Sequence, residues 1–310
     1  MTEPHRCGFI GILGRPNVGK STLLNRVLGQ KLAIATPKPQ TTRDRIQGIR
    51  TFPDWQAIFV DTPGIHEAKT RLNRHMVDLA IATVGDVDLC YLLIDVHKAT
   101  TPNGLERTLN ETAAIVEHIK AAGKPAFLVI NKIDKLAERS DLFALIEKVT
   151  PLHDWKEIVP VSAKKSDNVE RLLATTRNYL PEGPPLFAAD TLTDRPMRFI
   201  AKEIIREQLF LHLAQELPYS TAVDILSWEE KGPSEGGVVV IHANVHVGRA
   251  SHKPIVVGKG GSQIKVIGEQ ARTRIERLLE RKVFLDLRVK VDEGWVDRAE
   301  ALKGLGYGDE

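Results

Sequence analysis

The residues best arranged for chemistry form an eight-residue loop near the N-terminus. It reads Gly14-Arg15-Pro16-Asn17-Val18-Gly19-Lys20-Ser21, which fits the pattern G-x-x-x-x-G-K-[ST], and Thr22 follows it. In such a loop backbone N–H groups turn towards phosphate oxygens, the lysine contacts the β and γ oxygens, and the serine hydroxyl binds Mg²⁺. An apolar run precedes the loop and a helical pattern follows it. The loop therefore predicts a site for a nucleoside triphosphate with Mg²⁺, in which Lys20 is a catalytic residue.

A second polar motif, expected at the same phosphates, follows an apolar run and reads Asp61-Thr62-Pro63-Gly64. The Asp61 carboxylate at the end of a strand can bind the metal, and the N–H of Gly64 can sense the γ-phosphate, which makes Gly64 a catalytic residue. Between the two motifs lies Gln40-Thr41-Thr42-Arg43. Thr42, which we favour over Thr41, is expected to complete the Mg²⁺ shell while a third phosphate is bound and to be a catalytic residue as well.

Two further polar segments predict that the base is guanine. The first is Asn131-Lys132-Ile133-Asp134, in which the Asp134 carboxylate can accept from N1–H and the 2-amino group of guanine, and adenine offers neither donor. Asn131 is expected to tie this segment to the phosphate loop, and the stem of Lys132 to cover the base. The second is Ser162-Ala163-Lys164, which can direct a backbone N–H to guanine O6. Together the segments predict GTP and GDP as ligands.

A glycine-rich turn in the C-terminal third predicts a second binding site. Gly258-Lys259-Gly260-Gly261 fits G-x-x-G and is followed by apolar residues at helical spacing. This segment resembles the KH domain of the helix-first kind, whose loop approaches phosphates and whose groove takes about four unpaired nucleotides. The resemblance implies RNA contacts from residues in and around the turn: Ile255, Gly258, Lys259, Gly260, Gly261, Lys265 and Arg272.

The elements that must carry these segments follow from the pattern of apolar residues. Up to about residue 180, β-branched runs alternate with helical patterns, which predicts an α/β domain with a six-stranded, mostly parallel sheet and helices on both faces. Four prolines between Leu180 and Pro196 mark a boundary. A helix, two strands, two helical pieces and a last strand then predict a smaller α+β domain. We expect a nucleotide domain over 1–180, a linker over 181–196, an RNA-binding domain over 197–292 and a tail over 293–310, with a hairpin turn at 234–237.

Composition limits the class of protein. The 310 residues are 42% hydrophobic and 27% charged, and no apolar run approaches the ~20 residues of a membrane span, which predicts a soluble protein of about two domains. No secretory signal is visible, so we expect the cytoplasm. Cys7 and Cys90 lie in apolar runs, which favours buried thiols over a disulfide or metal site. The net charge of +3 is small, but 245–290 holds 11 Lys and Arg against four acids, which favours a polyanionic partner.

Taken together, the motifs resemble those of the translation-factor class of GTPases, and with the C-terminal part they resemble the Era family of bacterial ribosome-assembly GTPases. The resemblance covers nearly the whole chain. It implies GTP hydrolysis, single-stranded rRNA at the 3′ end of 16S rRNA as the partner, and a role in assembly of the small (30S) ribosomal subunit. Local recognition in one groove fits single-stranded RNA better than duplex DNA.

One departure from Ras-like GTPases affects the mechanism. Ile65 stands where those enzymes have a glutamine after D-x-x-G, and an isoleucine cannot orient water. In related GTPases an asparagine at the position of Asn17 helps to hold a monovalent cation, which implies K⁺ as a further cofactor and a catalytic role for Asn17.

Two alternatives remain at this point. The C-terminal domain could bind a protein or an anionic membrane surface, with peripheral association at the cytoplasmic face of the inner membrane. The chain could also be a tRNA-modifying GTPase with similar motifs, but those relatives carry a C-terminal cysteine and a folate-binding domain, whereas this chain ends Gly306-Tyr307-Gly308-Asp309-Glu310.

Overall fold

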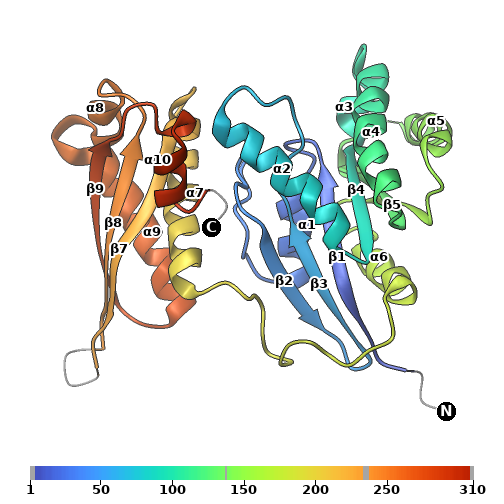
Figure 1. Ribbon diagram of the computed structural model, residues 1–310, viewed down its shortest axis with the longest axis horizontal. Coiled ribbons are helices and arrows are strands. Elements are labelled where there is room, and N and C mark those ends of the chain that lie inside the picture. The colour runs from blue at the N-terminus through green and yellow to red at the C-terminus, as the bar shows by residue number, and fades with distance from the viewer. Residues whose placement is uncertain (1–3, 137, 233–236, 308–310) are drawn as a thin grey trace. The chain divides into compact units, whose positions relative to one another are not determined.

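Six short apolar stretches pair into one sheet in the N-terminal part of the chain (Figure 1). The computed structural model describes residues 4–136, 138–232 and 237–307. The strand order is β2-β3-β1-β4-β5-β6, and all neighbours are parallel except the antiparallel pair β2 and β3. The strands are β1 (Arg6–Gly14), β2 (Ile46–Thr51), β3 (Trp55–Asp61), β4 (Leu89–Asp95), β5 (Ala126–Asn131) and β6 (Glu157–Val161).

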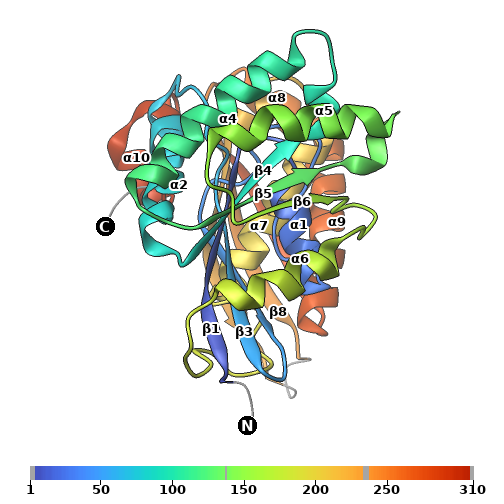
Figure 2. The ribbon, with the colours of Figure 1, turned by 90° about the vertical axis from the view of Figure 1, so that its right-hand side faces the viewer.

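Helices cover both faces of this sheet, because β3, β4 and β5 are buried along their whole length and are apolar on both sides (Figure 2). Apolar side chains of α2, α4 and α5 pack on one face, and α1 and α6 lie on the other. The helices are α1 (Lys20–Leu28), α2 (Arg71–Asp86), α3 (Val96–Ala99), α4 (Gly104–Ala121), α5 (Arg139–Val149) and α6 (Val169–Thr176). This arrangement confirms the predicted α/β class.

The parallel register brings the polar segments of the sequence to one edge of the sheet. Asp61 is level with Ile12 of β1, and Asp95 at the end of β4 is level with Asn131 at the end of β5. Since the carboxyl ends of parallel strands share an edge, the loops that follow them form one ligand site.

The chain divides into two compact units, Met1–Glu67 with Met76–Asp194, and Ala68–His75 with Arg195–Glu310. The proline-rich segment expected to be a linker is hydrogen-bonded within the first unit as far as Leu192. Its backbone pairs with that of β1 and β2: Cys7 N donates to Pro181 O at 3.1 Å, and Ile49 N donates to Leu192 O at 2.8 Å. In addition, the Gln56 carboxamide oxygen accepts from the N–H of Leu186 at 2.8 Å. Proline ends the helix, but it does not prevent an extended chain from packing along a sheet.

The second unit contains a three-stranded sheet in the order β7-β8-β9, with β7 and β8 antiparallel and β8 and β9 parallel. Its elements are α7 (Met197–His212), β7 (Thr221–Glu230), β8 (Val239–Val247), α8 (His252–Val257), α9 (Ser262–Leu279), β9 (Val283–Val291) and α10 (Ala299–Gly304). The order matches the predicted α+β pattern. Of the predicted hairpin turn, residues 234–236 lie outside the described part of the chain.

The core of the second unit lies between α7, α9 and the sheet. Ile267, Ala271 and Ile275 of α9 are fully buried, as their helical spacing predicted. The segment expected to be a tail also packs into this unit, since Trp295 and Tyr307 are completely buried and the Trp295 indole donates to Ser220 O at 2.9 Å. Residues 295–307 are therefore part of the folded unit.

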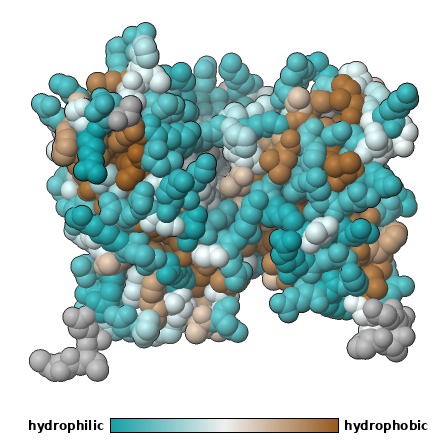
Figure 3. Space-filling view, turned by 180° about the vertical axis from the view of Figure 1, so that it is seen from behind, coloured by the Kyte–Doolittle hydropathy of each residue, from teal (hydrophilic) through white to brown (hydrophobic). Residues whose placement is uncertain are grey.

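Helix length and surface hydropathy bear on the question of a membrane span. Within the described ranges, no helix combines the length and the apolarity needed to cross a bilayer. The face shown in Figure 3 is mostly hydrophilic, with hydrophobic side chains gathered in separate patches. Cys7 and Cys90 are free and buried, which confirms the prediction from their apolar surroundings.

Candidate functional site

Unusual backbone conformations shape the loop between β1 and α1. Gly14 and Gly19 have φ values of 139° and 106°, where a side chain is strained, and a Cβ on Gly14 would lie 2.6 Å from the Leu93 carbonyl oxygen. A Cβ on Gly19 would strike the side-chain amide of Asn131. Both glycines are thus required by conformation and by space, and α1 begins directly after them at Lys20.

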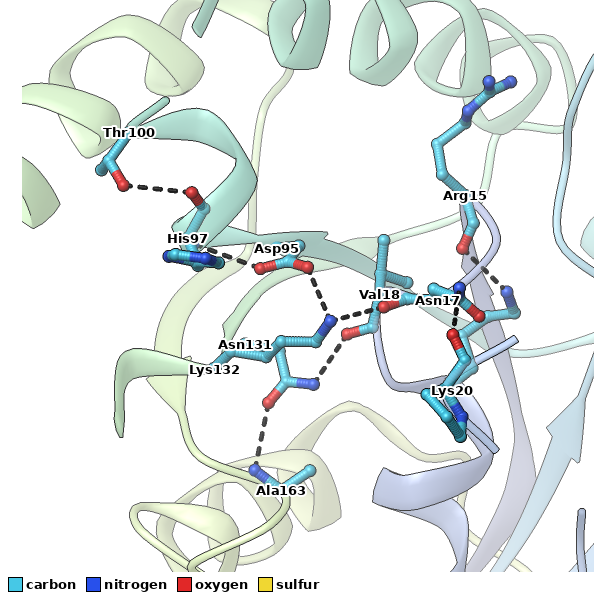
Figure 4. Close-up of polar contacts among 11 residues, drawn as sticks. Arg15, Asn17, Val18, Lys20, Asp95, His97, Thr100, Asn131, Lys132 and Ala163 are labelled. Atoms are coloured by element: carbon cyan, nitrogen blue, oxygen red, sulfur yellow. Dashed lines mark hydrogen bonds and ion pairs between the residues drawn. The ribbon is translucent and has the colours of Figure 1, made fainter. Parts of the chain in front are cut away.

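Lys20 is held at the mouth of this loop by the loop itself. Its ammonium group donates to the carbonyl oxygens of Gly14 and Arg15, each at 3.1 Å (Figure 4). Burial lowers the pKa of Lys20 to about 8, and the nearby Asp61 carboxylate partly offsets this effect. A negatively charged ligand bound in the loop would stabilise the protonated form of Lys20.

Three oxygen-bearing side chains converge beside Lys20. The Ser21 hydroxyl donates to Asp61 Oδ2 at 2.7 Å and lies 2.9 Å from the Thr42 hydroxyl, which itself lies 3.3 Å from Asp61 Oδ2. Thr42 is the threonine that the structure brings to this point. Burial raises the pKa of Asp61 to about 6. Within the described residues, Asp61 Oδ1 is buried without a hydrogen-bond partner. Two hydroxyls and an unsatisfied carboxylate oxygen suit a hard, oxygen-binding cation such as Mg²⁺.

The segment after Asp61 lies against the phosphate loop. A Cβ on Gly64 would come within 2.7 Å of the Pro16 nitrogen, so only glycine allows this approach. The N–H of Ile65 donates to Gly14 O at 3.2 Å, and the Ile65 side chain packs against the apolar cluster under α2 and α4. The side chain that follows Gly64 is therefore partly buried against this cluster.

Asn131 and Lys132 link their own segment, at the end of β5, to three other segments of the site (Figure 4). The Asn131 amide donates to Val18 O at 2.8 Å, and its oxygen accepts from Ala163 N at 3.0 Å. The Lys132 ammonium donates to Asn17 O at 2.6 Å and pairs with Asp95 Oδ2 at 2.6 Å. These contacts join the segments after β1, β4, β5 and β6 into one frame.

Asp134 is oriented by the segment after β6. The Ser162 hydroxyl donates to Asp134 Oδ1 at 2.6 Å, which fixes the carboxylate and leaves Oδ2 for other donors. The backbone N–H groups of Ser162 and Ala163 are bonded to Asp167 O and Asn131 Oδ1. The predicted segment has three backbone N–H groups. These bonds occupy two of them and leave the N–H of Lys164 for a ligand.

The glycine-rich turn of the second unit joins α8 to α9. Gly258 has a φ of 77°, and a Cβ there would lie 2.6 Å from the Cβ of Gln263, whereas Cβ atoms on Gly260 and Gly261 would meet nothing within 4 Å. Gly258 is therefore needed for packing, while the other two glycines keep an exposed, left-handed turn open. Lys259 in the turn is exposed, and so is Ile255, at 54% of its surface.

A groove of about 230 Å³ lies between α9 and β9, next to this turn. Two of the predicted RNA contacts, Lys265 and Arg272, line it, whereas Ile255 does not. Its other lining residues are Ile264, Gly268, Glu269, Leu285 and Leu287. The groove has an apolar floor and a rim of two cations and one carboxylate.

Some of these residues were missed by sequence reasoning. Asp95 ends an apolar strand as Asp61 does, so its position was a usable signal, although only the register shows that it reaches Lys132. Gly268 lies opposite Leu287, and a Cβ there would make only an ordinary van der Waals contact of 3.5 Å with the Leu287 side chain. No local pattern marks the apolar residues of β9 as the floor of a groove.

Comparison with known proteins decides the family. Residues 9–132 match the family model of the 50S ribosome-binding GTPases, and residues 216–296 match that of the KH domain. GTPase Era of Trichlorobacter lovleyi is 48% identical over 303 residues, which is 98% of each chain. GTPase Era of Geotalea uraniireducens is 47% identical over 99% of this chain and 100% of its own. This chain belongs to the GTPase Era family.

Two solved Era structures match nearly the whole chain. Era in complex with MgGDPNP and nucleotides 1506–1542 of 16S ribosomal RNA matches at 40% identity with a TM-score of 0.90, over 98% of this chain and all of the other. A single-residue variant of Aquifex aeolicus Era bound to GDP·AlF4⁻ matches at the same identity and coverage with a TM-score of 0.89. As a member of the GTPase Era family, the chain hydrolyses GTP to GDP and phosphate, and a KH domain follows its P-loop GTPase domain.

Proposed function

We propose that this GTPase is a switch that binds single-stranded rRNA at the 3′ end of 16S rRNA and leaves after GTP hydrolysis, and so acts in 30S subunit assembly. The observation that carries the proposal is the likeness over 98% of the chain to an Era whose crystal structure holds both MgGDPNP and nucleotides 1506–1542 of that RNA. A protein that binds this RNA would act in the cytoplasm.

In this proposal the nucleotide lies at the edge of the first sheet. Asp134 accepts from the guanine ring, Lys132 covers the base, and the Lys164 N–H faces guanine O6. The hydrogen bond from Ser162 to Asp134 supports the first assignment, because it presents a fixed double acceptor. Backbone N–H groups of the phosphate loop and the Lys20 ammonium hold the phosphates, and the N–H of Gly64 faces the third one.

Ser21, Thr42 and Asp61 would hold Mg²⁺, which supplies charge that stabilises the transferring phosphoryl group. The unpartnered Asp61 oxygen and the two hydroxyls beside it support this set. Thr42 lies on the segment between the two phosphate motifs, so its position would report whether a third phosphate is bound.

Asn17 would hold K⁺ at the phosphate loop. Its side-chain nitrogen donates to Pro37 O at 2.9 Å, which leaves the carboxamide oxygen for a cation and brings a carbonyl oxygen close to it. The proposal predicts faster hydrolysis in K⁺ than in Na⁺ at equal ionic strength, and no difference in Asn17→Ala. Equal wild-type rates in the two salts would exclude the role.

The groove beside the Gly258–Gly261 turn would take the RNA. Its apolar floor suits bases, and the exposed cations Lys259, Lys265 and Arg272 suit the backbone phosphates. An anionic membrane surface would need only the charge and would make no use of a groove of about 230 Å³, so RNA is favoured over peripheral membrane association. Duplex DNA is too wide for it.

The decisive experiment replaces Lys259 and Gly260 by aspartates and measures filter binding of an oligonucleotide with the 3′-end sequence of 16S rRNA. Carboxylates in the turn repel phosphates, so the double variant should bind at least about tenfold more weakly. Log affinity of the wild type should fall with log salt at a slope of roughly −2 to −3, since each phosphate neutralised on a single strand contributes about −0.7. The slope should flatten in the variant.

The chain offers a matched control in the adjacent pair Lys303 and Gly304, both exposed at the end of α10. The same double replacement there changes the net charge equally but lies outside the turn. Both variants should bind GTP as the wild type does. RNA binding that survives in the Lys259 and Gly260 variant would reject the groove, and flotation of the wild type with anionic vesicles would then favour the membrane alternative.

A further inference from the structure

The structure leaves the attacking water without the side chain that usually orients it. In Ras-like enzymes a glutamine after the glycine of D-x-x-G does so. Here that residue is Ile65, whose partly buried side chain packs against the apolar cluster under α2 and α4. A water-orienting group must therefore come from another segment beside Gly64 and Thr42.

Gln40 is such a residue. It lines the same cavity as Lys20, Thr42 and Gly64. Its backbone has a φ of 56°, in the left-handed region that a non-glycine residue seldom adopts without a compensating contact. That contact is present, because Gln40 Nε2 lies 2.8 Å from His66 Nε2.

The hydrogen bonds of His66 determine which atom of Gln40 is free. His66 Nδ1 lies 2.6 Å from the Gly64 carbonyl oxygen, which can only accept, so Nδ1 carries the proton. Burial lowers the pKa of His66, and the charges of Arg15 and Lys20 lower it further, so the ring is neutral near pH 7. Its Nε2 is then an acceptor, and the Gln40 amide nitrogen must donate to it. The Gln40 carboxamide oxygen is left as the acceptor for another donor.

We propose that the Gln40 carboxamide oxygen accepts a hydrogen bond from the attacking water and that His66 is the positioning residue that holds this carboxamide in place. The proposal rests on the proposed nucleotide site. It assigns to two residues, 26 positions apart, the task that one glutamine performs in Ras-like enzymes. Gln40 is catalytic in this scheme, whereas His66 acts only through Gln40.

The test is the single-turnover rate of hydrolysis of bound GTP, compared with affinities for GDP and for the non-hydrolysable analogue GDPNP. Gln40→Ala and His66→Ala should each slow hydrolysis at least about tenfold, a loss typical of a positioned hydrogen-bonding group. Both affinities should stay within about threefold of the wild type. Unchanged rates, or affinities that fall in parallel with the rate, would overturn the proposal.

Two further variants separate positioning from mere structural support. Glutamine at position 66 can accept from Gln40 and donate to Gly64 O, so His66→Gln should retain the rate within about threefold. The double variant Gln40→Ala with His66→Ala should be no slower than Gln40→Ala alone. Additive losses, or a His66→Gln variant as slow as His66→Ala, would show that His66 does not act through Gln40.

A transition-state mimic gives an independent readout. GDP with aluminium fluoride imitates the transferring phosphoryl group and its attacking water, so Gln40→Ala should require at least about tenfold more fluoride complex for half-saturation while GDP affinity holds. Ile65→Ala, one residue after Gly64, is the matched control and should form the complex as the wild type does. A wild type that binds no GTP would reject the nucleotide site itself, whereas equal complex formation by Gln40→Ala would reject only the role of Gln40.

Discussion

Replacing Asp134 by asparagine tests the base assignment most directly, because it exchanges one oxygen for an NH₂ group. One carboxylate oxygen is fixed by the Ser162 hydroxyl at 2.6 Å. In the proposed site the carboxylate accepts from N1–H and the 2-amino group of guanine. A hydrogen bond to a charged group contributes about 1.5 to 3 kcal/mol. The variant loses the hydrogen bond to the 2-amino group and replaces the one to N1–H by a neutral bond of about 1 kcal/mol, which costs about 2 to 5 kcal/mol, or roughly 30- to 5000-fold in GTP affinity.

The same substitution should raise the affinity for xanthine nucleotides. Its 2-oxo group accepts where guanine has a donor, so the asparagine NH₂ can donate to it while the amide oxygen accepts from N1–H. The wild-type carboxylate also accepts from N1–H, so the gain is the bond to the 2-oxo group; at about 1 kcal/mol it predicts that XTP affinity rises about fivefold over the wild type. The Ser162 hydroxyl can donate or accept, so it can hold the asparagine as well.

The assay is competition of GTP and XTP against a fluorescent guanine or xanthine nucleotide. Ser162→Ala is the control, since it loosens Asp134 without changing its chemistry and should weaken GTP binding without favouring XTP. If Asp134→Asn loses GTP and gains nothing for XTP, the carboxylate does not contact the base and the reasoning fails.

Three other outcomes follow from the geometry. Lys20→Ala should weaken GTP and XTP by the same factor, at least about tenfold, because its partner is phosphate; unequal losses would contradict this. Asp95→Ala removes the 2.6 Å partner of Lys132 and should speed GDP release about tenfold in stopped-flow fluorescence, with Asp95→Asn milder; wild-type release would refute the anchor. Burial raises the pKa of Cys90 from 9.0 to about 12, so at pH 8 its thiolate fraction is roughly a thousandfold below that of a free thiol. It should resist a thiol reagent until urea unfolds the protein, and since the folded state keeps this proton, the free energy of unfolding should fall as pH rises from about 9 towards 12.

The strands and helices of the first unit were predictable because each follows from a local pattern. All six strands and the predicted helices lie within a few residues of the stretches that their apolar periodicity indicated. The four-residue helix α3 was not predicted, since about one turn shows no period, and α10 lies in the segment that was expected to be a tail. In the second unit the helical pattern of the sequence runs from Met197 to Leu217, but α7 ends at His212, because Leu213 turns to an extended conformation with ψ of 152°.

The sequence by itself determined the components of the nucleotide site. Glycine at positions 14 and 19, a lysine and serine after them, and an aspartate at the end of a strand are local features. Their spacing predicts a backbone conformation and therefore a chemistry. The same holds for Gly258 to Gly261, where glycines permit the left-handed turn that the structure contains.

Only the tertiary structure decided which distant groups meet. The contacts of Lys132 with Asp95 and of Gln40 with His66 join residues 37 and 26 positions apart. The groove of the second unit exists because α9 lies beside β9. Likewise, the proline-rich segment after residue 180 reads as a linker, and its hydrogen bonds to β1 and β2 come from the sheet edge it meets. The type of a side chain determines which groups it can bond to, but strand register and helix packing determine which groups lie within bonding distance. Register and packing depend on the whole domain, so a local stretch of sequence does not predict them.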